Sequence, residues 1–319
     1  MRRRELIGGL GAATLAWPAR AQLLDRLRKI GVLWPGATPP RMEAFDQGLR
    51  DAGLLQGQHV AIELRHSAQG IEQLRALAAE LLKLDVSTIA TFGDVAPRAA
   101  QQATTTVPIA AIADDVLGGG LIESLARPGG NTTGITILSP ELCAKRLAVL
   151  KEILPNLSEA GFLWDPSSGT TQIKTTEHAA RLLNVKLNIF DVQRPRDLAG
   201  ALQAAKQAGM EAINVGASPL LSSMYRSIVD FTAANGLPAI YQWKEHAVSG
   251  GLASYGAGLA EMWRETGLLV AKLLRGANPA ELPIRQPTKF ELVLNLATAK
   301  ALRLTLAPSL LIRADEVIE

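Results

Sequence analysis

The chain has 319 residues, with 33 basic and 30 acidic side chains and a formal net charge of +3. No lysine- and arginine-rich run follows the first 22 residues, so nucleic-acid binding lacks its electrostatic basis. Cys143 is the only cysteine, which excludes an intramolecular disulfide and a cysteine-based metal cluster.

The N-terminal segment predicts export. Arg2, Arg3 and Arg4 precede a short apolar stretch over residues 6–17, and alanines at 19 and 21 are the small residues that a signal peptidase reads. The arginine pair followed by apolar residues fits the twin-arginine pattern. We therefore expect residues 1–21 to be a twin-arginine signal peptide, and the mature chain to carry 29 basic and 29 acidic residues. An amphipathic N-terminal helix is the alternative, which the glycines of this segment disfavour.

The expected location is the periplasm. The predicted cleavage point lacks a cysteine for lipid attachment, and no later apolar run reaches the length of a membrane helix. The sequence therefore predicts a soluble protein without a stable membrane anchor.

After the signal, short apolar runs alternate with longer amphipathic runs, the pattern of βα units on a parallel sheet. In chain order, strands are predicted over residues 29–34, 60–64, 86–91, 109–112 and 133–138, with helices over 41–52, 71–84 and 96–103. A second series then begins. Residues 161–164 (Gly-Phe-Leu-Trp) echo 31–34 (Gly-Val-Leu-Trp), 211–215 echo 86–91, and 237–240 echo 107–110. Three echoes in order predict a duplicated α/β lobe, although any two βα sheets share some local pattern.

The boundary between the lobes is predicted near residues 134–140, where a strand meets a helix that begins at Ser139 with Pro140 in its first turn. A helix over 261–274 and a strand over 289–294 exceed what a second lobe needs. We therefore expect a first lobe of residues 28–138 plus 257–319 and a second lobe of 139–256. The predicted fold class is α/β, with two Rossmann-like lobes that have parallel sheets and are joined by a hinge of several crossovers.

Three segments carry a family resemblance: residues 120–134 (GLIESLARPGGNTTG), 237–241 with 250–256, and 286–295 with 313–316. They resemble the ABC transporter substrate-binding family that includes tryptophan- and phenylalanine-binding proteins. The resemblance implies the type I periplasmic-binding fold with about three crossovers. It also implies a small-molecule solute held between the lobes and passed to the permease subunits of an ABC importer. We expect a monomer that has no cofactor.

Ligands of open α/β sheets bind beyond the carboxyl ends of the strands, so the loops after the strands are the candidate site. The candidate ligand-binding residues are Gly36, Ala37, Thr38, Gly93, Asp94 and Asp115 in the first lobe, and Asp165, Ser167, Ser168, Gly216, Ala217, Ser218, Tyr241 and Tyr255 in the second. An amino acid or related carboxylate suits this mixture. Its carboxylate could take hydrogen bonds at Ser167, Ser168 or Ser218, and its ammonium could pair with Asp94 or Asp115.

Several of these residues have a simpler structural interpretation. Asp165 and Ser167 are residue types that cap helices. Trp34 and Trp164 end equivalent predicted strands, where packing in the core or hinge is as good an explanation as stacking on a ligand. A glycine run at 118–120 favours a tight turn over a phosphate loop, because no Lys-Ser/Thr follows it.

The sequence argues against an enzyme and against a metal site. The four histidines lack metal-ligand spacing within a helix, and no Gly-x-Ser-x-Gly motif is present. Two alternatives to a transport protein stay open: a ligand sensor that signals to a membrane receptor, and an exported α/β hydrolase.

Overall fold

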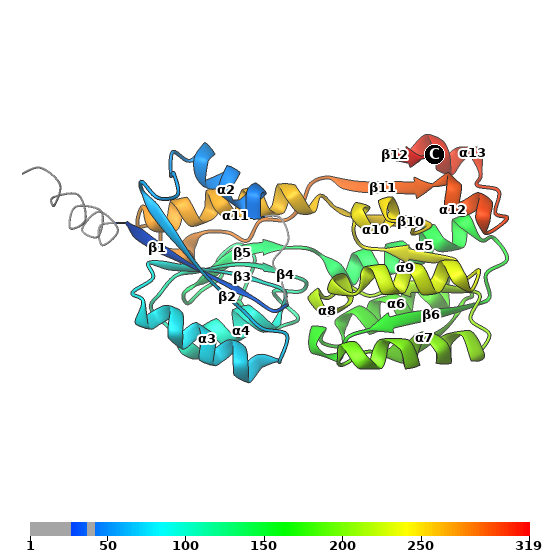
Figure 1. Ribbon diagram of the computed structural model, residues 1–319, viewed down its shortest axis with the longest axis horizontal. Coiled ribbons are helices and arrows are strands. Elements are labelled where there is room, and N and C mark those ends of the chain that lie inside the picture. The colour runs from blue at the N-terminus through cyan, green and yellow to red at the C-terminus, as the bar shows by residue number, and fades with distance from the viewer. Residues whose placement is uncertain (1–26, 37–41) are drawn as a thin grey trace, which may run out of the picture.

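The computed structural model describes residues 27–36 and 42–319, so the predicted signal peptide lies outside the described residues. The chain forms two α/β lobes that lie end to end (Figure 1). Each lobe is built around one sheet, and helices cover both faces of that sheet.

The first lobe has a parallel sheet in the order β2-β1-β3-β4-β5. Its strands are β1 (Arg28–Trp34), β2 (Val60–His66), β3 (Thr88–Phe92), β4 (Ile109–Ala113) and β5 (Thr132–Thr136). Every residue of β3, β4 and β5 is buried, because a parallel sheet with helices on both faces shields its central strands completely. This is why these strands are almost continuously apolar or small.

Two pairs of helices sandwich this sheet. They are α2 (Met42–Asp51) with α11 (Leu259–Leu274), and α3 (Ile71–Lys83) with α4 (Val95–Ala103). Alternate residues of β1 serve the two faces: Ile30 and Val32 pack toward α2 and α11, and Leu33 packs toward α3 and α4. Gly48 and Gly267 let α2 and α11 approach closely, since a Cβ on Gly48 would lie 3.1 Å from the Cα of Gly267.

The second lobe has the strand order β12-β11-β10-β9-β8-β6-β7. Its strands are β6 (Glu159–Trp164), β7 (Lys186–Asp191), β8 (Ala212–Val215), β9 (Ala239–Tyr241), β10 (Ala253–Ala257), β11 (Phe290–Asn295) and β12 (Glu316–Ile318). The order β7-β6-β8-β9-β10 repeats the order β2-β1-β3-β4-β5 of the first lobe. The echoed residues 31–34 and 161–164 therefore occupy equivalent strands, and the predicted fold class is confirmed.

The helices of the second lobe also lie on two faces. Helices α5 (Ser139–Ile153) and α6 (Thr171–Leu182) cover one face, and α7 (Leu198–Gln207) and α9 (Tyr225–Ala234) cover the other. Shorter helices follow the strands or the chain end: α8 (Pro219–Ser223), α10 (Lys244–Val248), α12 (Leu296–Ala301) and α13 (Pro308–Arg313). Three 3-10 turns complete the elements: η1 (Pro166–Ser168), η2 (Pro195–Asp197) and η3 (Pro279–Glu281).

The chain passes between the lobes three times. The first crossover joins β5 to α5 through Leu138, which has a left-handed φ of 59°. The second joins β10 to α11, and the third runs from a bridge between Arg285 and Ile135, beside β5, to β11 (Figure 1). Three crossovers agree with the multi-crossover hinge expected from the resemblance.

The lobe assignment of the chain end needs one correction. Residues 257–319 were predicted to belong to the first lobe, and α11 does pack there against α2. Strands β11 and β12 instead belong to the second sheet, where β11 pairs antiparallel with β10 over Ala253↔Leu294 to Ala257↔Phe290. Local periodicity identifies a strand at 289–294, but only the hydrogen-bonded partner decides which sheet it joins.

Candidate ligand-binding site

A cavity of about 530 Å³ lies between the two lobes, at the carboxyl ends of the strands. The first lobe and the crossovers contribute Trp34, Phe92, Gly93, Ile112, Asp114, Ile137, Leu259 and Trp263. The second lobe contributes Ser218, Pro219, Ser222, Ser223, Tyr225, Gln242, Trp243, Glu245 and His246. The volume lies within the range of pockets that enclose small molecules.

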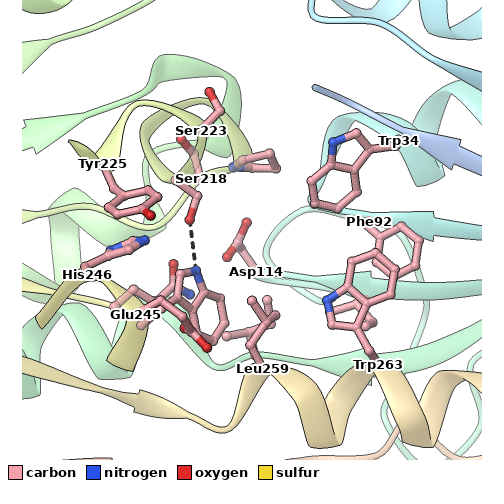
Figure 2. A pocket seen from close by; sticks show the side chains of 17 residues that line it. Trp34, Phe92, Asp114, Ser218, Ser223, Tyr225, Glu245, His246, Leu259 and Trp263 are labelled. Carbon is pink, nitrogen blue, oxygen red and sulfur yellow. Dashed lines mark hydrogen bonds between the residues drawn. The ribbon is translucent and has the colours of Figure 1, made fainter. Parts of the chain in front are cut away.

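Three aromatic rings form one wall of this cavity (Figure 2). Phe92 at the end of β3 stacks on Trp263 in the first turn of α11, with 3.8 Å between ring centroids and 23° between planes. Trp34 at the end of β1 lies 5.4 Å from Phe92 and 5.6 Å from Trp263, centroid to centroid. A ring of a ligand that enters the cavity meets a broad apolar surface here.

The opposite wall carries the hydroxyls of Ser218 and Ser222, each of which accepts one hydrogen bond from the protein. Ser218 caps α8, and its Oγ accepts the backbone N–H of Leu221 at 3.1 Å. Ser222 Oγ accepts the indole N–H of Trp243 at 2.9 Å. Neither hydroxyl donates to an acceptor among the described residues, so each proton is available for an acceptor atom in the cavity.

Asp114 brings a carboxylate between the two walls (Figure 2). The end of β4 positions it, and its Oδ1 accepts the hydroxyl of Ser139 at 2.7 Å. Asp94 lies behind it and accepts the backbone N–H of Asp114 at 2.9 Å. Burial raises the pKa of both carboxyl groups, and the nearby charge of Asp114 raises the pKa of Asp94 further. The pair therefore favours a cation beside Asp114, which would offset the cost of a buried negative charge.

His246 and Tyr225 form a second aromatic pair on the second lobe. Their rings stack with 4.6 Å between centroids and 12° between planes. Burial, together with the smaller effect of the Arg146 guanidinium charge, lowers the pKa of His246 to about 3. The imidazole is therefore neutral at physiological pH and acts in the cavity as an uncharged hydrogen-bonding group.

The fold and the cavity match those of a known protein family. The family model of ABC transporter substrate-binding proteins matches residues 37–318. The chain belongs to this family. Its members are substrate-binding proteins and not enzymes, as the sequence indicated. Over the described ranges, no helix of this substrate-binding protein is long and apolar enough to cross a membrane.

Individual relatives share about a fifth of their residues with this substrate-binding protein. A tyrosine-binding protein from Clostridioides difficile (strain R20291) is 22% identical over 264 residues, which cover 82% of this chain and 75% of the relative. An ABC domain from Streptococcus pneumonia, solved in complex with L-Trp, is 22% identical and has a TM-score of 0.83 over 92% of this chain and 100% of that chain. A conserved domain protein from Vibrio cholerae also has a TM-score of 0.83 at 22% identity, over 91% and 99% of the two chains. These structures establish the type I periplasmic-binding fold.

Two of the predicted ligand-binding residues, Gly93 and Ser218, line the cavity of the substrate-binding protein. Gly93 has a φ of 70°, and a Cβ there would lie 2.5 Å from Cγ of Pro219 in the other lobe. Gly36 lies beside the indole of Trp34, since a Cβ on it would be 2.6 Å from Nε1. The predicted residues at 37 and 38 lie outside the described residues.

The two predicted acids of the first lobe lie next to the cavity, behind its lining. Asp94 is buried and holds the backbone at Asp114 and Asp115 through its Oδ1. Asp115 turns away from the lining, and its Oδ1 accepts the backbone N–H of Gly118 at 2.8 Å. Of the adjacent acid pair, the structure therefore brings Asp114 into the cavity and uses Asp115 in a turn.

The predicted residues at the end of β6 bond to one another. Asp165 accepts the backbone N–H of Ser167 at 2.9 Å, and Ser168 donates its hydroxyl to the Asp165 carbonyl at 2.7 Å. This is the capping arrangement that the sequence left open as an alternative. Gly216 and Ala217 follow β8, where Ala217 exchanges two hydrogen bonds with the side chain of Gln172.

The two predicted tyrosines lie outside the cavity lining. Tyr241 is fully buried in the second lobe, and its hydroxyl lies 3.1 Å from the hydroxyl of Thr232. Burial raises the pKa of its phenol. Tyr255 on β10 is half-buried and stacks on Phe290 of β11, with 6.3 Å between centroids.

Several cavity residues were not among the sequence candidates, namely Phe92, Asp114, Trp243, His246 and Trp263. Phe92 directly precedes the candidate Gly93, and Asp114 directly precedes the candidate Asp115, so the sequence pointed to the two loops that reach the cavity. Trp263 carried no local signal, because α11 reaches the cavity only by returning to the first lobe late in the chain.

Proposed function

We propose that this protein is the soluble periplasmic component of an ABC importer that captures an amino acid with an aromatic side chain. One observation carries the proposal: the cavity offers two hydroxyl donors at one wall, an aromatic surface at the other, and a carboxylate between them. An amino acid has the matching groups, since its carboxylate accepts, its ammonium donates and its side chain is apolar.

Each group of the solute has a partner in this arrangement. The solute carboxylate accepts the hydroxyl protons of Ser218 and Ser222. The ammonium donates to Asp114, and the side-chain ring packs against Phe92 and Trp34. Charge-assisted hydrogen bonds in a buried site are stronger than neutral ones, so the two charged ends supply orientation and the ring supplies buried area.

The relatives support the same chemistry, because one is named as a tyrosine-binding protein and another is solved with L-Trp. The arginine pair of the N-terminal segment supports export. Family membership supports delivery to permease subunits, and we propose that the protein acts as a monomer.

Isothermal titration calorimetry tests the solute assignment. We expect L-tyrosine, L-phenylalanine or L-tryptophan to bind at least about 100-fold more tightly than L-glutamate or D-glucose. Phenylalanine amide lacks the carboxylate, and 3-phenylpropanoate lacks the ammonium, so each should bind at least about tenfold more weakly than phenylalanine. Failure of all three aromatic amino acids to bind at about 1 mM would refute the proposal.

Uptake by proteoliposomes that contain the permease and ATPase tests delivery. Transport of the labelled amino acid that depends on this protein supports an importer component. Binding without any transport, combined with activation of a membrane receptor, would assign the protein to sensing instead.

A further inference from the structure

One buried polar atom of the aromatic wall has no hydrogen-bond partner among the described residues. Trp263 is 1% exposed, and its indole Nε1 has no hydrogen-bond acceptor in the part of the chain that the structure describes. Figure 2 shows the nitrogen edge of this ring on the cavity side. Its neighbours on this wall, Phe92, Trp34 and Leu259, offer carbon surface or a further ring.

Two other indoles, both in the second lobe, set the expectation. The Nε1 of Trp243 donates to Ser222 at 2.9 Å, and the Nε1 of Trp164 donates to the carbonyl of Gly169 at 3.0 Å. Buried tryptophans normally find such a partner, because an N–H removed from water without an acceptor is costly. Trp263 differs from these two because no acceptor among the described residues faces its N–H, which lies on the cavity side of the ring.

We propose that Trp263 is a specificity-determining residue, which donates its indole N–H to an oxygen acceptor on the aromatic ring of the bound solute. The inference rests on the proposed function and narrows the solute class within it. A phenol ring supplies such an oxygen. A phenyl ring supplies none, and the ring nitrogen of an indole is a donor only, so both leave the N–H of Trp263 unsatisfied.

The comparison of L-tyrosine with L-phenylalanine measures this bond, because the two solutes differ by one oxygen. A site that buries a donor for a ligand hydroxyl discriminates against the analogue that lacks the hydroxyl. We expect the wild-type protein to bind tyrosine at least about tenfold more tightly than phenylalanine. Trp263→Phe keeps an aromatic ring and removes the N–H, so it should bring the two affinities to within about twofold, mainly by weakening tyrosine binding.

Trp243→Phe is the matched control. It removes an indole N–H whose acceptor, Ser222, belongs to the protein. It should change the affinities for tyrosine and phenylalanine by the same factor and leave their ratio at the wild-type value.

Indole ¹H–¹⁵N spectra provide a readout of the same bond in the wild-type protein. The Trp263 indole signal, identified by its absence in Trp263→Phe, should move downfield on addition of tyrosine and not of phenylalanine. Equal wild-type affinities for the two solutes, or an unchanged ratio in Trp263→Phe, would overturn the inference while leaving the proposed function intact. Absence of binding by any aromatic amino acid would instead defeat the proposed function itself.

Discussion

Asp114→Asn separates the charge of the cavity carboxylate from its shape. Asp114 is buried, and its Oδ1 accepts the Ser139 hydroxyl at 2.7 Å. An asparagine oxygen can accept the same bond, so the substitution mainly removes the negative charge. A hydrogen bond to a charged group contributes about 1.5 to 3 kcal/mol. We therefore expect binding of an aromatic amino acid to weaken by about 10- to 150-fold.

The same substitution should leave the unliganded protein as stable as the wild type, or more stable. Burial raises the pKa of Asp114, and the carboxyl of Asp94 lies close by. A folded-state pKa above the unfolded value of 3.8 means that the folded protein holds the proton longer as pH rises. The free energy of unfolding of the wild type therefore falls as pH rises from about 3.8 through the raised pKa. The variant should show a smaller fall over the same range.

Calorimetry with the solute and thermal denaturation between about pH 4 and 8 measure the two effects. Asp191→Asn is the control, because that side chain is exposed at the end of the edge strand β7 and does not line the cavity. Solute affinity in Asp114→Asn within about twofold of the wild type would contradict the proposed pairing with the ammonium. A large loss of stability without solute would show that Asp114 serves the fold rather than the ligand.

Two further substitutions test packing, one between α2 and α11 and one in the second lobe. A third tests the titration of His246. Gly48→Ala places a Cβ 1.9 Å from the carbonyl oxygen of Arg264, so α2 and α11 must separate, and thermal denaturation should show a loss of about 1 to 3 kcal/mol. Tyr241→Phe removes the hydroxyl contact with Thr232 and should cost about 1 kcal/mol in denaturant unfolding, with no change in solute affinity by calorimetry. The depressed pKa of His246, about 3 against 6.5, means that stability is lost as pH falls below 6.5. In denaturant unfolding, the free energy of unfolding should fall by up to about 5 kcal/mol as pH falls from 6.5 to about 3. His246→Gln should remove this pH dependence.

The fold class followed from the sequence because its signals are local. Apolar runs such as 109–112 become strands wherever helices cover both faces of a sheet, and the echo of 31–34 at 161–164 marks equivalent strands. The helix over 261–274 could be placed on the first lobe because its apolar face needs a sheet to cover. In each case the amphipathic pattern or the apolar run itself contains the information.

The site was decided by contacts between distant segments. The sequence placed the ligand at the strand ends, and the cavity lies there. It proposed Asp115 as the ligand-binding acid rather than Asp114, because neighbouring side chains point to opposite sides and only the surrounding lobes determine which side faces the cavity. Likewise, the destination of Tyr241 in the core and of Trp263 at the aromatic wall depends on packing partners far along the chain. Strand β11 joined the second sheet for the same reason, since a strand exposes the same backbone donors and acceptors to any partner, and only the tertiary structure supplies one.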